Sequence, residues 1–173
     1  MPRLSYDESL AALIRRGFLD EGDKPELAPT MPSPLDENPR LSFFRTRVEG
    51  DLSGLSIPRT LFCRSELCHC SFVGTDLSES FLCWNDVTDV DFSSALLSGA
   101  DLRASIYTRI RFSGTDLSRA DLRRTSFEEC DFTGAVMIGT KVSRSLWGGL
   151  KISPEQKQQI DWSWISGDQP PGG

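Results

Sequence analysis

A large apolar residue occupies every fifth position from Leu52 to Trp147. The twenty positions of this series hold only Leu, Ile, Val, Met, Phe, Tyr or Trp, although just 38% of the chain is hydrophobic. An α-helix repeats every 3.6 residues and a β-strand every two, so neither element has this period. The series therefore indicates a repeat architecture, in which stacked units share one continuous core.

Two other positions keep the same period. The residue two before each large one is mostly small, as at Ala95 and Thr115, and the residue directly before it is often Asp, as at Asp116. From about Gly50 to Gly149 the chain resembles the pentapeptide repeat family, whose consensus is A-(D/N)-L-X-X. The resemblance implies an all-β solenoid, a right-handed quadrilateral β-helix with four pentapeptides in each square coil. It also implies that the large and the small residue point inward and that the other three point outward.

Four pentapeptides per coil predict a second period of twenty residues. Phenylalanines recur at this interval at Phe72, Phe92, Phe112 and Phe132. So do the residues expected at one corner, Gly54, Gly74, Ser94, Gly114 and Gly134, where glycine suits unusual backbone angles. The sequence thus predicts about five coils, over 50–69, 70–89, 90–109, 110–129 and 130–149.

The flanking residues are expected to cap the repeat domain, 50–149, at its two ends. Residues 1–49 predict an amphipathic helix over 5–19, ended by Gly22, and then a proline-rich segment. Phe43 and Val48 predict an imperfect first coil, because they lie five apart but one residue out of register with Leu52.

Residues 150–173 predict a capping helix and a tail. Ser153 is a suitable N-cap, and Pro154 suits the first helical position. Large apolar residues follow at Ile160, Trp162, Trp164 and Ile165. This segment either covers the last coil or forms a homodimer interface, and the second alternative is suggested by the family resemblance.

Composition excludes several classes of protein. The formal net charge is −6 and the sequence pI is near 4.8, which argues against direct binding to nucleic acid. Neither a signal peptide nor an apolar stretch long enough to enter a membrane is recognised. Five cysteines cannot all pair within one chain, so we expect a cytoplasmic protein with reduced thiols. Cys63 and Cys83 lie twenty apart, close enough in adjacent coils for a disulfide, but are also expected as thiols.

Catalytic chemistry has little basis in this sequence. His69 is the only histidine and falls at an outward corner, so a surface role is expected for it. The triplet Cys68-His69-Cys70 is not expected to bind metal, because zinc usually takes four ligands and the register turns Cys70 inward and Cys68 outward. Phosphate-binding and metalloprotease motifs are absent. We therefore expect neither a cofactor nor an enzyme.

The charges of the expected outer faces are unequal. We call one face the basic face; it holds Phe62, Leu82, Leu102, Leu122 and Val142. It carries a net charge of +4, from Arg64, Arg103, Arg123, Arg124, Lys141 and Arg144 against Asp101 and Asp121. The next face, the acidic face, holds Leu67, Val87, Tyr107, Phe127 and Trp147. It carries −4, from Glu66, Asp86, Asp89, Glu128 and Glu129 against Arg109.

Apolar residues also stand on the basic face where polar ones are expected: Leu61, Phe81 and Trp84. Either the N-terminal helix and proline-rich segment cover them, or they belong to a partner interface. The predicted partner-binding residues are Phe81, Trp84, Arg103, Arg123, Arg124 and Arg144. The function predicted from them is non-catalytic binding of a protein, as an inhibitor, immunity protein or scaffold acting on a toxin or other enzyme.

The alternative function comes from the family resemblance, since some members protect DNA gyrase by mimicking duplex DNA. Mimicry needs a long, strongly negative rod. Five coils span only about 24 Å at the strand spacing, and the basic face interrupts the negative surface. Protein binding is therefore the favoured prediction.

Overall fold

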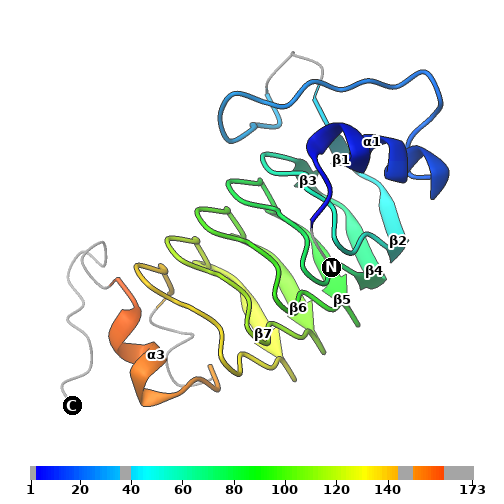
Figure 1. The fold of residues 1–173 in the computed structure, drawn as a ribbon. Coiled ribbons are helices and arrows are strands. Elements are labelled where there is room, and N and C mark those ends of the chain that lie inside the picture. The colour runs from blue at the N-terminus through cyan, green and yellow to red at the C-terminus, as the bar shows by residue number, and fades with distance from the viewer. Residues whose placement is uncertain (1–2, 36–39, 144–149, 162–173) are drawn as a thin grey trace.

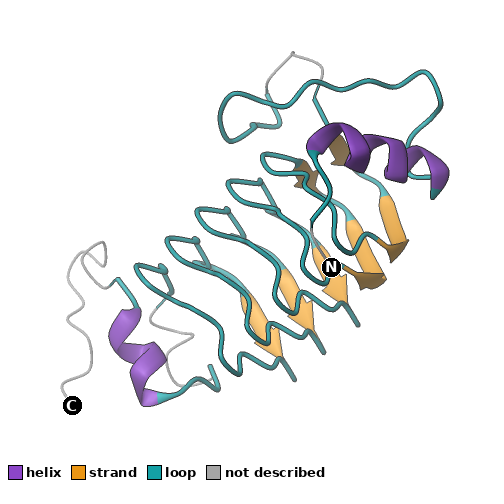
Figure 2. Ribbon diagram, viewed as in Figure 1, coloured by secondary structure: helices purple, strands orange, loops and turns teal. Residues whose placement is uncertain are grey.

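The computed structural model describes residues 3–35, 40–143 and 150–161 (Figure 1). The chain forms a solenoid, and in the described residues one helix lies at each end, α1 (Tyr6–Arg15) and α3 (Pro154–Gln159). Parallel sheets run along two faces, in the orders β1-β3 and β2-β4-β5-β6-β7 (Figure 2). The strands are β1 (Ser42–Phe44), β2 (Arg47–Asp51), β3 (Leu61–Cys63), β4 (Glu66–Ser71), β5 (Asp86–Thr88), β6 (Ile106–Thr108) and β7 (Ser126–Glu128). None of the helices in the described ranges is long and apolar enough to cross a membrane.

Each coil is twenty residues long. Along the acidic face Leu67 pairs with Val87, and Val87 pairs with Tyr107. Isolated bridges continue the same step on the other faces, for example between Ser71 and Asp91. The predicted right-handed quadrilateral β-helix is thus confirmed, with about four complete turns in the described residues. The expected fifth coil is described as far as residue 143, and Trp147 lies outside the described residues.

The predicted phenylalanine column forms the centre of the core. Ring centroids are 5.0 Å apart between Phe72 and Phe92, 5.5 Å between Phe92 and Phe112, and 4.9 Å between Phe112 and Phe132. All four are buried, whereas Phe127, also at a central position, is only partly buried. Stacked rings in successive coils therefore account for the period of twenty.

Polar groups at the small inward position find partners inside the core. The Thr115 hydroxyl donates a 2.7 Å hydrogen bond to the carbonyl of Phe92, a central residue of the previous coil. The Asn85 side-chain amide donates in the same way to the Phe62 carbonyl at 2.9 Å. Buried polar groups are tolerated when they are bonded, so serine, threonine and asparagine can occupy a position that alanine also fills.

The recurrent aspartates have a structural role as well. The Asp116 carboxylate accepts a 2.9 Å hydrogen bond from the backbone N–H of Ser118, and the same bond recurs at other coils. Aspartate forms such bonds to the backbone two residues ahead readily. The turn therefore explains the aspartates without a catalytic role.

All four corners of the coil, and not one, use left-handed backbone. Gly114 has a φ of +65°, as expected, but Trp84 at another corner has +56° and Arg124 has +58°. A Cβ added at Gly74 would meet no atom within 4 Å, so glycine is not needed for space. The unusual angles expected at the glycine corner are confirmed, and they recur at the other corners because every pentapeptide turns at the same position.

Helix α1 closes the N-terminal end of the solenoid. It begins after Ser5, whose side chain forms a capping box with Glu8, and it ends at Arg15 rather than at residue 19. Gly17, with a φ of +78°, ends it in place of the expected Gly22, because a left-handed glycine suits the position after a helix. Leu13 of α1 is buried in the main core, so the helix covers the apolar core at the open end of the first coil.

Strands β1 and β2 each add one strand to the N-terminal end of a sheet, β1 on the basic face and β2 on the acidic face. Phe43 lies beside Phe62, and Val48 beside Leu67, a step of nineteen residues rather than twenty. The register shift falls between Val48 and Gly50. The imperfect first coil was therefore correctly expected from the offset of one residue.

The C-terminal segment closes the other end. Ser153 caps α3 as expected, in a capping box with Gln156. The buried Gln156 amide donates to the carbonyls of Phe132 and Ala135, at 2.7 and 2.9 Å. These carbonyls belong to the last coil, so α3 replaces the next coil that would have bonded them. The residues expected in a homodimer interface, Trp162, Trp164 and Ile165, lie outside the described residues.

Candidate partner-binding surface

The outer surface of the basic face changes character along the solenoid axis. Each coil presents two outward side chains there, one on each side of the central residue. In the first two coils both are apolar or thiol side chains, and in the next two they are an acid and an arginine. The pairs in order are Leu61 and Cys63, Phe81 and Cys83, Asp101 and Arg103, and Asp121 and Arg123.

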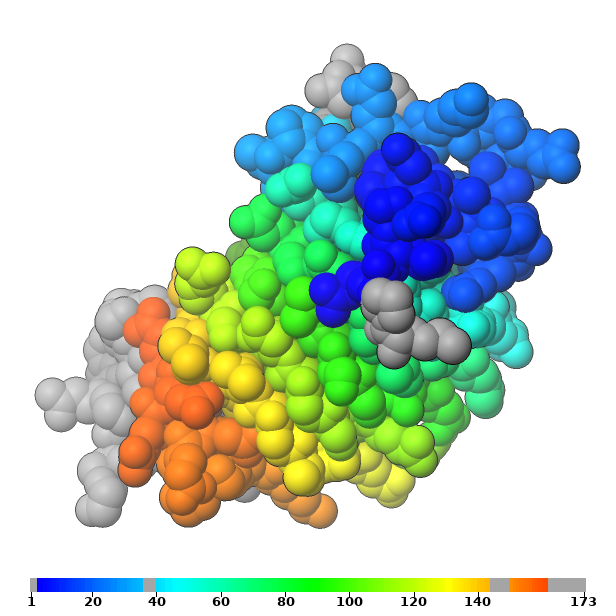
Figure 3. All heavy atoms as spheres, in the orientation of Figure 1, coloured from blue at the N-terminus to red at the C-terminus, as the bar shows by residue number. Residues whose placement is uncertain are grey.

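The apolar half is covered by part of the proline-rich segment. Residues 29–35, which we call the strap, lie against it, and Met31 packs on the cluster of Leu61, Cys63, Phe81 and Cys83. Leu61 is 5% exposed and Phe81 is 9% exposed. Of the two alternatives, covering by the proline-rich segment therefore applies to Leu61 and Phe81. Figure 3 shows the N-terminal residues, in blue, gathered at this end of the molecule.

Helix α1 does not help to cover the basic face. Helix α1 was expected over the basic face together with the proline-rich segment, but it plugs the end of the solenoid instead. The contact of the strap with Leu61 and Phe81 is apolar, through Met31. The hydrophobic effect therefore favours the position of the strap, because the strap removes the Leu61 and Phe81 side chains from water.

An open groove remains beside the strap. Its volume is about 500 Å³, and we call it the Trp84 groove. Its lining consists of Ser33, Pro34, Leu35, Phe44, Cys63, Arg64, Phe81, Trp84 and Arg103. Three of its apolar side chains are exposed: Trp84 by 53%, Phe44 by 41% and Leu35 by 89%. The groove is thus an apolar depression open to solvent, of the size that takes one or two side chains of a partner.

The repeat does not require a tryptophan at position 84. It occupies the left-handed corner position, where a bulky residue is unfavourable and glycine or asparagine would be preferred. The equivalent corner residues of the neighbouring coils are Arg64 and Ala104. The indole is 53% exposed, so most of its surface faces solvent.

Arg103 and Arg123 are less available than the sequence suggests. Arg103 forms two hydrogen bonds to Asp101, of 2.8 and 2.6 Å, and Arg123 forms an equivalent pair with Asp121. Burial alone would raise the pKa of Asp101, but hydrogen bonds from Arg103 and Cys83 outweigh burial and lower it. The hydrogen bond to Asp101 in turn raises the pKa of Arg103. Both arginines are therefore neutralised within their own coil.

Other arginines surround the groove. Arg64 lines it, and the Arg45 guanidinium lies 5.2 Å from the centre of the Phe44 ring. Arg124 is exposed at the same corner, two coils beyond Trp84, while Arg144 lies outside the described residues. Leu35, Phe44 and Arg64 were not among the predicted site residues. Arg64 could have been found from the sequence, because it lies twenty residues before Trp84 and therefore occupies the same corner in the adjacent coil.

His69, Cys68 and Cys70 each lie beside a different partner. The exposed His69 has its Nε2 3.7 Å from Asp89 Oδ2, and Cys70 is buried and donates to the Val48 carbonyl. Cys68 was expected to point into solvent, but it is only 4% exposed, and Arg47 of β2 lies beside it. Within the described ranges, no three side chains of His, Cys, Asp or Glu are grouped to hold a metal ion.

Cys63 and Cys83 are described as free thiols, buried beneath the strap. Burial raises the pKa of both. A raised pKa keeps the thiol protonated and weakly nucleophilic, so neither is suited to covalent catalysis.

The acidic face contains neutralising contacts too. Asp89 accepts two hydrogen bonds from Arg109, at 2.6 and 2.8 Å, and Glu66 accepts one of 2.8 Å from Arg47. Its negative charge is therefore interrupted along the axis.

Comparison with known proteins agrees with this architecture. The family model for pentapeptide repeats matches residues 108–146, in eight copies. The matched residues are pentapeptide repeats. A crystal structure of a pentapeptide repeat protein from the Arabidopsis thaliana thylakoid lumen is 27% identical, with a TM-score of 0.55, over 57% of this chain and 70% of that one.

Two further solved structures match at lower identity. Rfr23, a pentapeptide repeat protein from the cyanobacterium Cyanothece 51142, is 13% identical, with a TM-score of 0.46, over 60% of this chain and 85% of its own chain. QnrB1, a plasmid-mediated fluoroquinolone resistance protein, is 15% identical, with a TM-score of 0.30, over 59% of this chain and 65% of that one. No curated protein sequence matches the chain significantly.

Proposed function

We propose that the protein is a non-catalytic binding module, of the inhibitor or immunity type, that captures a protein partner at the Trp84 groove. The observation that carries the proposal is an exposed tryptophan that lines an open groove together with Arg64. Tryptophan and arginine are the residues most often found to dominate binding energy at protein interfaces. Pentapeptide repeat proteins generally act as structural or binding modules, which agrees with this assignment.

The partner segment should carry an apolar side chain next to a carboxylate. The apolar side chain would lie against Trp84 and Phe44, and the carboxylate would reach Arg64, whose planar guanidinium can bind it with two hydrogen bonds. Arg124, farther along the same corner, extends the positive rim. Arg103 and Arg123 contribute less than the sequence predicts, because Asp101 and Asp121 already hold them.

Capture from the source cell tests the proposal when it is done with matched variants. Wild type, Trp84→Gly and Glu129→Gly would be immobilised, and retained proteins compared by mass spectrometry. Glu129 is an exposed left-handed residue on the acidic face, so its replacement is the control for the backbone change. We expect one or more proteins retained by wild type and by Glu129→Gly but lost with Trp84→Gly. Identical sets from all three would show that the groove is not the binding surface.

Duplex DNA mimicry receives no support from the geometry. A mimic needs unpaired negative charge at regular intervals, but Arg47 and Arg109 neutralise two of the acids on the acidic face. We therefore do not propose gyrase as the partner.

A further inference from the structure

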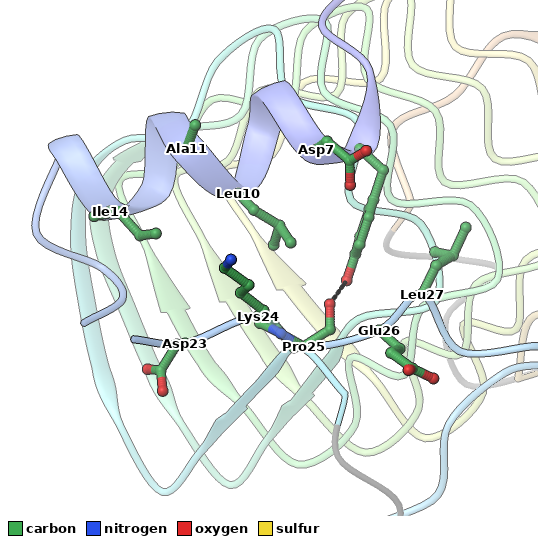
Figure 4. Close-up of a pocket in the computed structure, with 10 residues that line it drawn as sticks. Asp7, Leu10, Ala11, Ile14, Asp23, Lys24, Pro25, Glu26 and Leu27 are labelled. Atoms are coloured by element: carbon green, nitrogen blue, oxygen red, sulfur yellow. Dashed lines mark hydrogen bonds between the residues drawn. The ribbon is translucent and has the colours of Figure 1, made fainter. Parts of the chain in front are cut away.

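A second cleft lies at the N-terminal end of the solenoid, between α1 and residues 23–27 (Figure 4). Its volume is about 590 Å³, and we call it the cap cleft. Leu10, Ala11 and Ile14 of α1 form one wall. The Tyr6 hydroxyl donates a 3.0 Å hydrogen bond to the Pro25 carbonyl and ties the two walls together. The cleft is thus held open by the capping elements and not by the repeat.

The apolar side chains of the cap cleft are only partly used for folding. Ala11 is exposed, Ile14 is half-buried and Leu27 is 39% exposed. Neither Ile14 nor Leu27 belongs to the solenoid core or to the cluster beneath the strap. An apolar surface that serves neither cluster and faces solvent is available to a partner.

The charges of the cap cleft are opposite to those of the Trp84 groove. Three carboxylates, Asp7, Asp23 and Glu26, line it against the single ammonium of Lys24. Figure 4 shows the Lys24 side chain extending from one wall toward Leu10 on the other. The chain therefore already places an aliphatic stem with a cationic end between these walls, and two negative charges remain in excess.

We propose that the cap cleft binds a basic, apolar segment of a protein partner, in which one Lys or Arg is flanked by an apolar side chain. The apolar side chain would contact Ile14 and Leu27, and the cation would meet Glu26 and its neighbouring acids. The proposal is independent of the Trp84 groove, because the two sites share no lining residue and select opposite charges. Together they give one end of the solenoid two distinct docking positions.

The test uses a defined probe and the full chain. The ¹⁵N-labelled protein is titrated with acetyl-leucyl-arginyl-leucinamide, and amide shifts are followed by NMR. We expect saturable shifts at Ala11, Ile14 and Leu27. Glu26→Lys should weaken binding about three- to tenfold, because it turns an attraction into a repulsion. Lys24→Ala should tighten binding about two- to fivefold, because it removes the competing cation.

The matched control is Glu21→Lys, which makes the same charge change outside the cleft lining and should alter binding less than twofold. Three results would overturn the proposal. The first is the absence of shifts in the cleft, and the second is equal weakening by Glu26→Lys and Glu21→Lys. The third is concentration-dependent shifts of the cleft amides without probe, which would show that a second copy of the chain occupies it.

A second peptide, acetyl-leucyl-glutamyl-leucinamide, keeps the two proposals separate. It should shift the Trp84 side-chain and backbone signals and leave the cap cleft unchanged. Failure of the arginyl probe alone overturns the cap cleft, and failure of the glutamyl probe alone counts against the Trp84 groove.

Discussion

Trp84 lies beside Phe81, with their ring centroids 6.1 Å apart, yet Phe81 is 9% exposed and Trp84 is 53% exposed. The strap separates the two environments. Phe81 is part of the covered cluster with Met31, whereas Trp84 stands at the edge of the covered area. One aromatic is therefore shielded from water, and most of its neighbour is exposed.

The first prediction compares truncation of these two rings. Phe81→Ala should lower the free energy of unfolding by about 3 kcal/mol, as expected for a large buried side chain. Trp84→Gly should change it by less than about 1 kcal/mol, because relief of the left-handed strain offsets the lost contact with Phe81. Denaturant unfolding of the two variants measures both values. Equal losses would mean that Trp84 is a folding residue and would remove the main support for the Trp84 groove.

The second prediction concerns the phenylalanine column. Phe112→Ala should cost about 3–5 kcal/mol, because it leaves a cavity between rings stacked on both sides. Arg111→Ala, next to it in the chain, should cost less than about 0.5 kcal/mol, since its side chain is 72% exposed and its ion pair with Asp91 is long, at 3.4 Å. Urea unfolding of both variants measures the two costs. A register in which residue 111 points inward and residue 112 outward requires the larger cost at Arg111.

The third prediction concerns the C-terminal cap. Gln156→Leu should cost about 1–3 kcal/mol, because it removes hydrogen bonds to the Phe132 and Ala135 carbonyls at a buried position. Gln158→Leu, at an exposed position of the same helix, is the control and should be nearly neutral. Thermal unfolding measures both. A neutral Gln156→Leu would show that α3 is not needed to close the last coil.

The repeat could be predicted from the sequence because its rules are local. The period of five determines which side chains point inward, and the period of twenty determines which of them stack, so Phe112 could be placed from its position alone. The caps were predictable for the same reason. Ser5 and Ser153 each precede a residue three positions later that completes a capping box.

The covering of the basic face could not be predicted in this way. The strap has no period, and its position depends on contacts such as that of Met31 with Phe81, which join residues fifty apart in the chain. Cys68 was misplaced for a related reason. The repeat turns it outward, but β2 from the imperfect coil brings Arg47 over it.

The pairing of Arg103 with Asp101 could have been predicted but was not. In the triplet Asp101-Leu102-Arg103 the leucine points inward, so both charged side chains emerge on the same outer face. The net charge of that face counts Arg103 and Asp101 separately, so it does not show that the two side chains bind each other. The same argument applies to the triplet at 121–123.

The last prediction follows from that pair and concerns acid. The pKa of Asp101 in the folded protein lies below its ordinary value of 3.8, because the hydrogen bonds from Arg103 and Cys83 outweigh the effect of burial. A carboxyl whose folded pKa is lowered contributes stability that is present above the unfolded pKa and is lost as pH falls through the folded one.

Asp101→Asn should therefore cost about 1–3 kcal/mol at pH 7, and the difference from wild type should shrink as pH falls below about 4. Denaturant unfolding between pH 2.5 and 7, where the fold persists, gives the two curves. Arg103→Met, which removes the partner and keeps the aliphatic stem, should flatten the same part of the curve, because Asp101 then loses its main donor. A pH-independent gap between wild type and Asp101→Asn would contradict the pairing, since it would mean that the asparagine differs from aspartate in packing and not in charge.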